Sequence, residues 1–152
     1  MAFLSSMNIV ASGLTAQQLR LDVVSENVTN STTTRTENGG AYRRKVVAFQ
    51  EIPQKESFRD VMTRTAGLTA NADRRTGGGV RVAQILEDPS DFKMVFDPTH
   101  PDANAEGYVE MPNVDMIKEM TDAIAANQAY AANVTAFNTL KAVIAKGLEI
   151  GR

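Results

Sequence analysis

The chain of 152 residues contains no cysteine, no tryptophan and a single histidine. The absence of cysteine excludes disulfides and thiol chemistry, and it is compatible with any redox compartment. Aromatic residues make up only 6% of the sequence, so any globular core is modest. The formal net charge is −2, which provides no basic surface of the kind that binds nucleic acid or an anionic membrane.

Long apolar runs are also missing. No stretch reaches the roughly 18 consecutive apolar residues that span a bilayer, so we expect no membrane span. The N-terminal residues do not form a cleavable secretion signal, because the first basic side chain is Arg20 and because Ser5, Ser6 and Asn8 interrupt the apolar stretch. We expect a protein that stays in the cytoplasm or leaves it by a route that reads no cleaved signal.

The N-terminal segment predicts a long helix from about Phe3 to Val28. Its apolar residues recur at alternating steps of three and four, and Gln17 occupies the one polar position in the row. This spacing places the row on one face of a helix, as in the seam of a coiled coil. The row consists of Phe3, Met7, Val10, Leu14, Leu21, Val24 and Val28.

The C-terminal segment predicts a second helix from about Val114 to Glu149, with no internal proline. It is far longer than the usual helix of about 11 to 12 residues. Its first apolar row has the same spacing, with Asn127 at the polar position, and a second row runs beside it at steps of seven. The first row is Ile117, Met120, Ile124, Ala131 and Val134, and the second is Met116, Ala123, Tyr130, Phe137 and Ile144.

Each helix thus has more than one apolar contact direction. If the two ends of one chain paired only with each other, the apolar residues that face other directions would stay in water. Each of them would then lack the roughly 1.5–3 kcal/mol that burial of such a side chain provides. We therefore expect neighbouring copies or related proteins to cover both helices. The predicted assembly interface comprises Phe3, Met7, Val10, Leu14, Leu21, Val24, Val28, Ile117, Met120, Ile124, Ala131, Val134, Phe137, Leu140, Ile144 and Leu148.

The middle of the chain predicts a small β-rich region. Turn-forming residues separate short runs of β-branched and aromatic residues at 42–52, 80–86, 92–96 and 108–111. Residues 54–79 are polar and small, which is typical of a flexible excursion. The predicted fold is mainly α, with long terminal helices paired as a coiled coil around this middle region. The predicted division is 1–34 and 113–152 for the helical core domain and 35–112 for the β-rich region.

Motifs that carry chemistry are weak. His100 lies between Asp97 and Asp102 in a proline-bounded loop, but one histidine and two aspartates in a turn indicate a solvated loop better than a metal site. The glycines at 77–79 lack the Gly-Lys-Ser/Thr of a phosphate loop and indicate a hinge. The basic run 43–45 alternates along a strand and indicates a solvated or subunit-bridging edge. We expect no catalytic site, no cofactor and no metal.

Two segments resemble a known family. Residues 12–51 read SGLTAQQLRLDVVSENVTNSTTTRTENGGAYRRKVVAFQE, and the C-terminal segment from residue 101 contains PDANAEGYVEMPNV and ends in LEIGR. Both are similar to bacterial flagellar basal-body rod proteins, and most narrowly to the C-type proximal rod proteins. The LDVVSENVTN stretch resembles the box shared by flagellar axial proteins. The match covers about 90 residues, and it departs from the family between 54 and 79 and at Thr29 and Ser31.

The resemblance implies a structural subunit of the proximal rod, which crosses the periplasm and transmits motor torque. Family members pair their terminal helices into a coiled-coil domain around the export channel, and they leave the cytoplasm through the flagellar type III export apparatus. The implied partners are copies of the chain, neighbouring rod and base proteins, and that apparatus.

Three alternatives remain open on the sequence. The chain could be another rod or hook-type axial protein, although the stretch 42–47 and the C-terminal signatures argue against it. It could be a cytoplasmic coiled-coil adaptor that binds an amphipathic helix in its groove. Hydrogen exchange on the dilute monomer separates these classes, because an axial subunit has unprotected ends and a closed adaptor is protected throughout. A wall hydrolase would need a carboxylate pair in a cleft, for which the sequence offers no framework.

Overall fold

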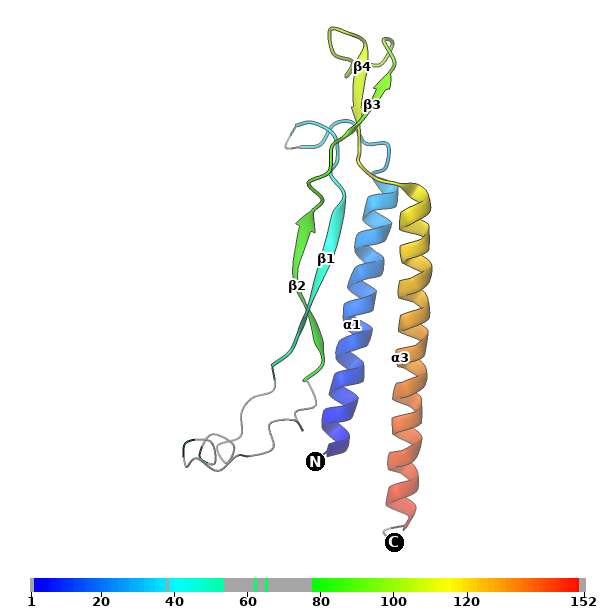
Figure 1. The fold of residues 1–152 in the computed structure, drawn as a ribbon. Helices are drawn as coiled ribbons and strands as arrows, with labels where there is room; N and C mark the ends of the chain where they lie inside the picture. Colours follow the sequence, from blue (N-terminus) through cyan, green and yellow to red (C-terminus); the bar gives the residue numbers. More distant parts are fainter. Residues whose placement is uncertain (1, 38, 54–61, 63–64, 66–77, 151–152) are drawn as a thin grey trace.

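Two long helices form the body of the molecule. The computed structural model describes residues 2–37, 39–53, 62, 65 and 78–150. Helix α1 spans Ala2–Thr29 and helix α3 spans Met116–Ile150, and they lie side by side in opposite directions (Figure 1). The predicted helices are confirmed, with each boundary within two residues of its expected position. Because α3 is the longer helix, its C-terminal end extends past the start of α1 (Figure 1).

Contacts along the pair fix how α1 and α3 align. Near the top, the Nδ2 of Asn27 donates to Oε2 of Glu119 at 3.0 Å. Two turns before Asn27 in α1, a guanidinium nitrogen of Arg20 lies 3.0 Å from Oδ1 of Asp122 in α3. Near the middle, a Cβ at Gly13 would lie 3.0 Å from Nδ2 of Asn133, so α3 passes close to the backbone of α1 there. Gly13, Arg20 and Asn27 are seven residues apart, which places them on one line facing α3.

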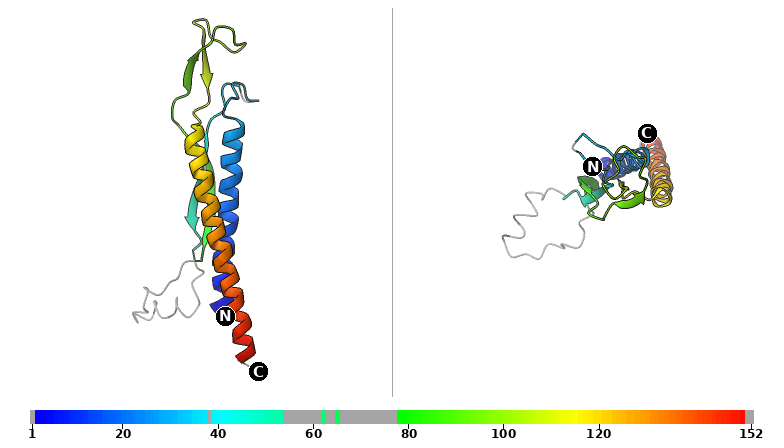
Figure 2. Two further views of the ribbon diagram at one scale, coloured as in Figure 1. Left: turned by 90° about the vertical axis from the view of Figure 1, so that its right-hand side faces the viewer. Right: turned by 90° about the horizontal axis from the view of Figure 1, so that it is seen from above.

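A two-stranded antiparallel ribbon lies against α1. Strand β1 spans Lys45–Glu51 and strand β2 spans Val80–Glu87, with a register shift at Ala48 and Phe49. Among the described elements the ribbon packs on α1, and its backbone does not come close to that of α3. Seen from above, the ribbon and α3 therefore lie on different sides of α1 (Figure 2). The ribbon and α3 thus pack on two different faces of α1, and Asn27 of α1 bonds to both Lys45 of the ribbon and Glu119 of α3.

A second antiparallel hairpin projects beyond the helices. Strand β3 spans Lys93–Phe96 and strand β4 spans Tyr108–Met111. This hairpin stands above the end of α1 and the start of α3 (Figure 1). The rings of Phe96 and Tyr108 meet edge to face at 5.3 Å, and Gly107 turns the chain with a φ of +82° against Phe96. Three of the described strands lie within the predicted segments, and β2 extends one residue past its predicted end, to Glu87.

Specific polar residues determine where the helices begin and end. Below the β3–β4 hairpin, Asp115 caps α3, because its Oδ1 accepts the N–H of Ile117 at 3.0 Å and its carbonyl accepts that of Glu119. This cap explains why α3 begins at Met116 and not at Val114. After α1, the N–H of Asn30 donates to the carbonyl of Glu26 and the chain then turns away.

The foot of the ribbon is closed by two glycines. The N–H of Gly78 donates to the carbonyl of Ile52 at 3.1 Å, and Gly79 has a φ of +107° and packs directly on Ser12 of α1. A side chain at Gly79 would collide with the Oγ of Ser12, so the predicted hinge contains a close approach of backbone to helix. Gly77 and nearly all of the predicted flexible excursion 54–79 lie outside the described residues. None of the described helices is long and apolar enough to cross a bilayer.

Candidate functional site

A buried polar junction joins the two helices to the ribbon. Its centre is Glu119 of α3, whose side chain is fully buried. The Nε of Arg44 donates to Oε1 of Glu119 at 2.6 Å, and Asn27 of α1 donates to the other oxygen at 3.0 Å. Both carboxylate oxygens are thus paired, which offsets the cost of burying the charge.

Asn27 connects α1 to the first residue of β1. Its amide donates to the carbonyl of Lys45, and its Oδ1 accepts the N–H of Lys45, each at 2.9 Å. The side chain of Asn27 therefore pairs with the backbone as a neighbouring strand would. The hydroxyl of Tyr42 also donates to the same Oδ1 at 2.9 Å, and Lys45 forms an ion pair with Glu26.

Arg44 extends the junction to three carboxylates. Besides Glu119, its guanidinium nitrogens lie 3.4 Å from Asp88 and 3.4 Å from Asp122. Its own N–H donates to Oδ1 of Asn113 at 2.8 Å, and the amide of Asn113 donates to the carbonyls of Asp88 and Ser90. Arg44 is 9% exposed, so the expectation of a solvated or subunit-bridging edge is wrong for this residue.

The surroundings of the junction shift the pKa values of Arg44 and Tyr42. Burial alone would lower the pKa of Arg44, but the hydrogen bonds and charges of Glu119 and Asp88 raise it above its ordinary value. Burial, together with the carboxylates of Glu26, Glu119 and Glu87, raises the pKa of Tyr42 to about 12. Arg44 is thus a permanent cation and Tyr42 stays neutral. Groups held in these states position the helices and do not transfer protons near neutral pH.

Outside the junction, the contact between α1 and α3 uses the second predicted row of α3. Ala126 has no exposed surface, and Ala123, Tyr130, Asn133 and Phe137 on the same face are partly covered. Among the predicted interface residues, Val134, Leu140 and Ile144 are also partly covered.

The first predicted row of α3 does not face α1. Ile117 is 78% exposed, Met120 is 59% exposed and Ile124 is 58% exposed, while Ala131 and Leu148 are exposed as well. These residues contribute little to the fold of the single chain. They form an apolar surface that is free for contacts with other molecules.

The predicted row of α1 is less exposed than the first row of α3, but most of it is not fully buried. Val24 is buried, and the rest of the row is partly covered, except that nothing is described for the side chain of Phe3. The partly covered residues are Met7, Val10, Leu14, Leu21 and Val28.

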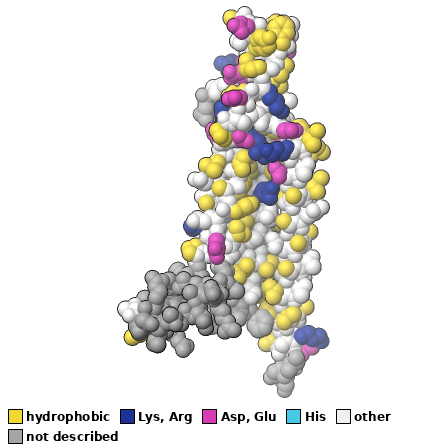
Figure 3. Space-filling view, in the orientation of Figure 1, with side chains coloured by type: hydrophobic (Ala, Val, Ile, Leu, Met, Phe, Trp, Pro, Cys, Tyr) yellow, Lys and Arg dark blue, Asp and Glu magenta, His cyan; other side chains and the backbone are white. Residues whose placement is uncertain are grey.

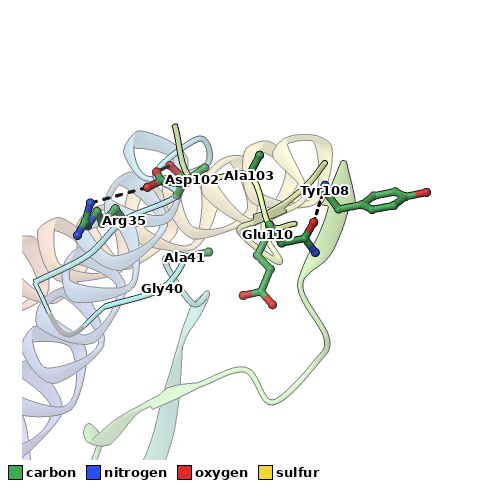
Figure 4. A pocket seen from close by; sticks show the side chains of 9 residues that line it. Arg35, Gly40, Ala41, Asp102, Ala103, Tyr108 and Glu110 are labelled. Carbon is green, nitrogen blue, oxygen red and sulfur yellow. Dashed lines mark hydrogen bonds and ion pairs between the residues drawn. The ribbon is translucent and has the colours of Figure 1, made fainter. Parts of the chain in front are cut away.

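A cavity of about 330 Å³ lies between the loop that follows α1 and the β3–β4 hairpin, where strand β4 and the loop that joins β3 to β4 line it (Figure 4). Asp102 accepts a hydrogen bond from the hydroxyl of Thr34 at 2.9 Å and lies 3.9 Å from Arg35. The side chain of Tyr108 points away from Asp102 and Arg35 (Figure 4). The Thr34 hydroxyl and the Arg35 guanidinium both pair with Asp102, so the polar groups of the lining hold the two segments together.

The loop around His100 has the local structure of a solvated turn. The Oδ1 of Asp97 accepts hydrogen bonds from the N–H and the hydroxyl of Thr99, and these bonds hold the pKa of Asp97 below its ordinary value. The N–H of Asp102 donates to Nδ1 of His100 at 3.1 Å. Across the described ranges, no group of three or more histidines and carboxylates could hold a metal ion.

Sequence comparisons match both ends of the chain. A family described as "Flagella basal body rod protein" matches residues 7–35, and one described as "Flagellar basal body rod FlgEFG protein C-terminal" matches residues 105–150. The flagellar basal-body rod protein FlgC of Bacillus subtilis is 50% identical over 151 residues, which cover 97% of each chain. The FlgC proteins of Borreliella burgdorferi and Escherichia coli are 40% and 37% identical over at least 98% of each chain.

Proposed function

Because the chain belongs to the FlgC family of flagellar basal-body rod proteins, we propose that its helix pair is the assembling part of a subunit of the proximal rod. The chain is a structural component of the basal-body rod and not an enzyme, and it assembles with copies of itself and other basal-body proteins. The proposal adds three points: where in the rod the chain lies, by which route it is exported, and which of its surfaces contact other subunits.

The exposed apolar row of α3 carries this proposal. A monomeric protein gains nothing from leaving Ile117, Met120 and Ile124 more than half exposed in one row. Covering such a row with another helix removes its apolar surface from water, which stabilises the assembly in proportion to the area buried. We therefore assign the predicted interface residues of both helices to contacts between subunits, with residues 1–34 and 113–152 as the helical core domain.

Coiled-coil packing and passage through the flagellar type III export apparatus belong to the same proposal. The spacing of the rows by three and four residues supports coiled-coil packing in the assembled rod. In that rod, the core domains polymerise around the export channel and transmit torque through the periplasm. The junction at Glu119 supports the transmission of torque, because it ties both helices to the ribbon through buried hydrogen bonds.

The proposal is tested by locating the chain in purified basal bodies. A strain without the chain should not swim, and the wild-type chain expressed in that strain should restore swimming and reappear in the basal-body fraction. Basal bodies that retain their rods while containing none of the chain would contradict the proposal. A chaperone-like role in the cytoplasm would instead leave the chain in the soluble fraction of swimming cells.

A further inference from the structure

The helix pair has two different flanks. The residues on either side of Gly13, Arg20 and Asn27 in the sequence of α1 show which flank is which. Each residue turns the direction of a helix by about 100°. Gly13 and Asn27 face α3, and the residues before them, Ser12 and Glu26, bond to Val80 and Lys45 of the ribbon. The residues that follow Gly13, Arg20 and Asn27 therefore point to the flank opposite the ribbon. These residues are Leu14, Leu21 and Val28.

Helix α3 adds to the same flank. The two helices are antiparallel. The residue that follows one facing the partner helix therefore points to the same flank of the pair, whether it belongs to α1 or to α3. Glu119 and Asn133 face α1, so Met120 and Val134 point to the flank opposite the ribbon, with Ile124 beside them. We call this surface, made of Leu14, Leu21, Val28, Met120, Ile124 and Val134 with the uncharged Asn127 between Met120 and Val134, the large-residue flank.

The other flank of α3 is made of small residues. One step backward from Ala126 and Asn133 gives Ala125 and Ala132, and Ala129 and Ala136 lie beside them. Ala125, Ala132 and Ala136 are exposed, and among the described elements the backbone of the ribbon approaches α1 and not α3. We call this surface the alanine flank. Its short side chains allow another helix to approach closely.

Charged residues are absent from the N-terminal part of α1 and from the middle of α3. The sequence has no charged residue from Ala2 to Leu19 and none from Ala123 to Leu140. On the face shown in Figure 3, the charged side chains of the helices gather at the upper junction and at the lower end of α3. Because no charged side chain occurs around this part of α3, another helix can pack on any of its sides without burying an unpaired charge. In the single chain, however, only the side of α3 that faces α1 is covered.

We propose that the large-residue flank of one copy receives the alanine flank of α3 from a second copy. Large side chains on one surface and small ones on the other let two helices interlock at short distance, and neither surface brings a charge into the contact. The two flanks lie on opposite sides of the same helix pair, so the contact uses unlike surfaces. Such a contact repeats from copy to copy and leaves both flanks available at the ends.

A symmetric contact between two large-residue flanks explains less. It would close after two copies and leave the alanine flanks uncovered, with the uncharged part of α3 still exposed. The inference rests on the proposed function, because it assumes that copies of the chain lie next to one another in the rod.

Engineered cysteines test this contact, since the chain has no cysteine of its own. Cells lacking the chain would express two forms together, one with Ile124→Cys and one with Ala132→Cys. After swimming is verified, basal bodies would be treated with a short bis-maleimide. We expect cross-linked dimers from this mixture, and none from Ile124→Cys alone or from Ile124→Cys mixed with Ala83→Cys on the ribbon. Met120→Cys, one turn from Ile124, serves as a second reporter if Ile124→Cys stops swimming.

The outcomes separate the inference from the function on which it rests. Dimers from Ile124→Cys alone would overturn the inference in favour of the symmetric contact. Basal bodies that contain the chain in swimming cells but give no dimer with either reporter would also overturn it, while the proposed function would stand. Basal bodies with intact rods and none of the chain would overturn the proposed function itself.

Discussion

The guanidinium of Arg44 lies 2.6 Å from the carboxylate of Glu119, although 75 positions separate the two residues in the sequence. Arg44 immediately precedes β1 and Glu119 lies in the first turn of α3, so this pair joins the ribbon to the C-terminal helix. Glu119 is fully buried and also accepts a hydrogen bond from Asn27 of α1. One carboxylate thus sets the relative positions of three elements.

Removing this carboxylate should destabilise the chain strongly. In Glu119→Ala, Arg44 keeps its charge in a largely buried site with one partner fewer, and breaking a buried pair in this way costs about 3–5 kcal/mol. Urea unfolding of the purified chain measures the effect. Glu149→Ala is the matched control, because Glu149 pairs with Lys146 on the surface and should change the free energy of unfolding by less than about 1 kcal/mol. Equal effects of the two variants would contradict the role of the junction.

The raised pKa of Tyr42 predicts a loss of stability at high pH. The pKa rises from 10.0 to about 12 on folding, chiefly because of burial. A group whose pKa is raised on folding stabilises the protein fully below its unfolded pKa and loses that contribution as the pH rises through its folded pKa. The free energy of unfolding should therefore fall between about pH 10 and about pH 12, and Tyr42→Phe should show a smaller fall over the same range. Parallel pH profiles of the two proteins would contradict this assignment.

Gly13 should tolerate no large side chain. A Cβ at this position already lies 3.0 Å from the amide of Asn133, so the longer side chain of Gly13→Leu would force α1 and α3 apart. We expect a loss of about 1–3 kcal/mol in the free energy of unfolding. Gly147→Leu makes the same exchange on α3, where a Cβ would have no atom within 4 Å other than those of its own helical turns in the described chain, and it should be neutral or stabilising by up to about 1 kcal/mol.

A charge on the exposed apolar row should block assembly without unfolding the chain. Ile124 is 58% exposed, so Ile124→Asp should change the free energy of unfolding by no more than about 0.5 kcal/mol. In the rod the aspartate would be buried without a partner, so we expect a loss of swimming in soft agar. Leu21 lies on the partly covered row of α1, and Leu21→Asp should also stop swimming, because the rod would bury its charge without a partner.

Ile124→Leu is the control at the same position, since it keeps the apolar surface and should preserve swimming. Normal swimming of the Ile124→Asp cells would defeat the assignment of this row to a subunit contact. A large loss of stability in the isolated Ile124→Asp chain would also count against it, because the row would then belong to the fold of the monomer.

The sequence predicted the elements well because their patterns are local. The apolar rows extend through both helices, and short β-branched runs bounded by proline, glycine or asparagine mark the four strands. The start of α3 differs by two residues because the capping bond of Asp115 decides it, and a row of apolar residues does not report a cap.

The orientation of the rows could not be predicted from spacing alone. The rows that contain Ile124 and Ala123 lie side by side on α3 and have the same period, and only the contacts of Gly13 and Asn27 with α3 show which row faces α1. The junction was missed for another reason. Asn27 and Glu119 are polar residues in otherwise amphipathic helices, and nothing in a single sequence tells that such residues meet across 92 positions.

Electron cryotomography of cells that lack this chain tests the central claim most directly. If the chain is a subunit of the proximal rod, the tomograms should show inner-membrane rings with no rod above them. A truncated rod would move the chain to a more distal position. Intact rods of full length would contradict the account.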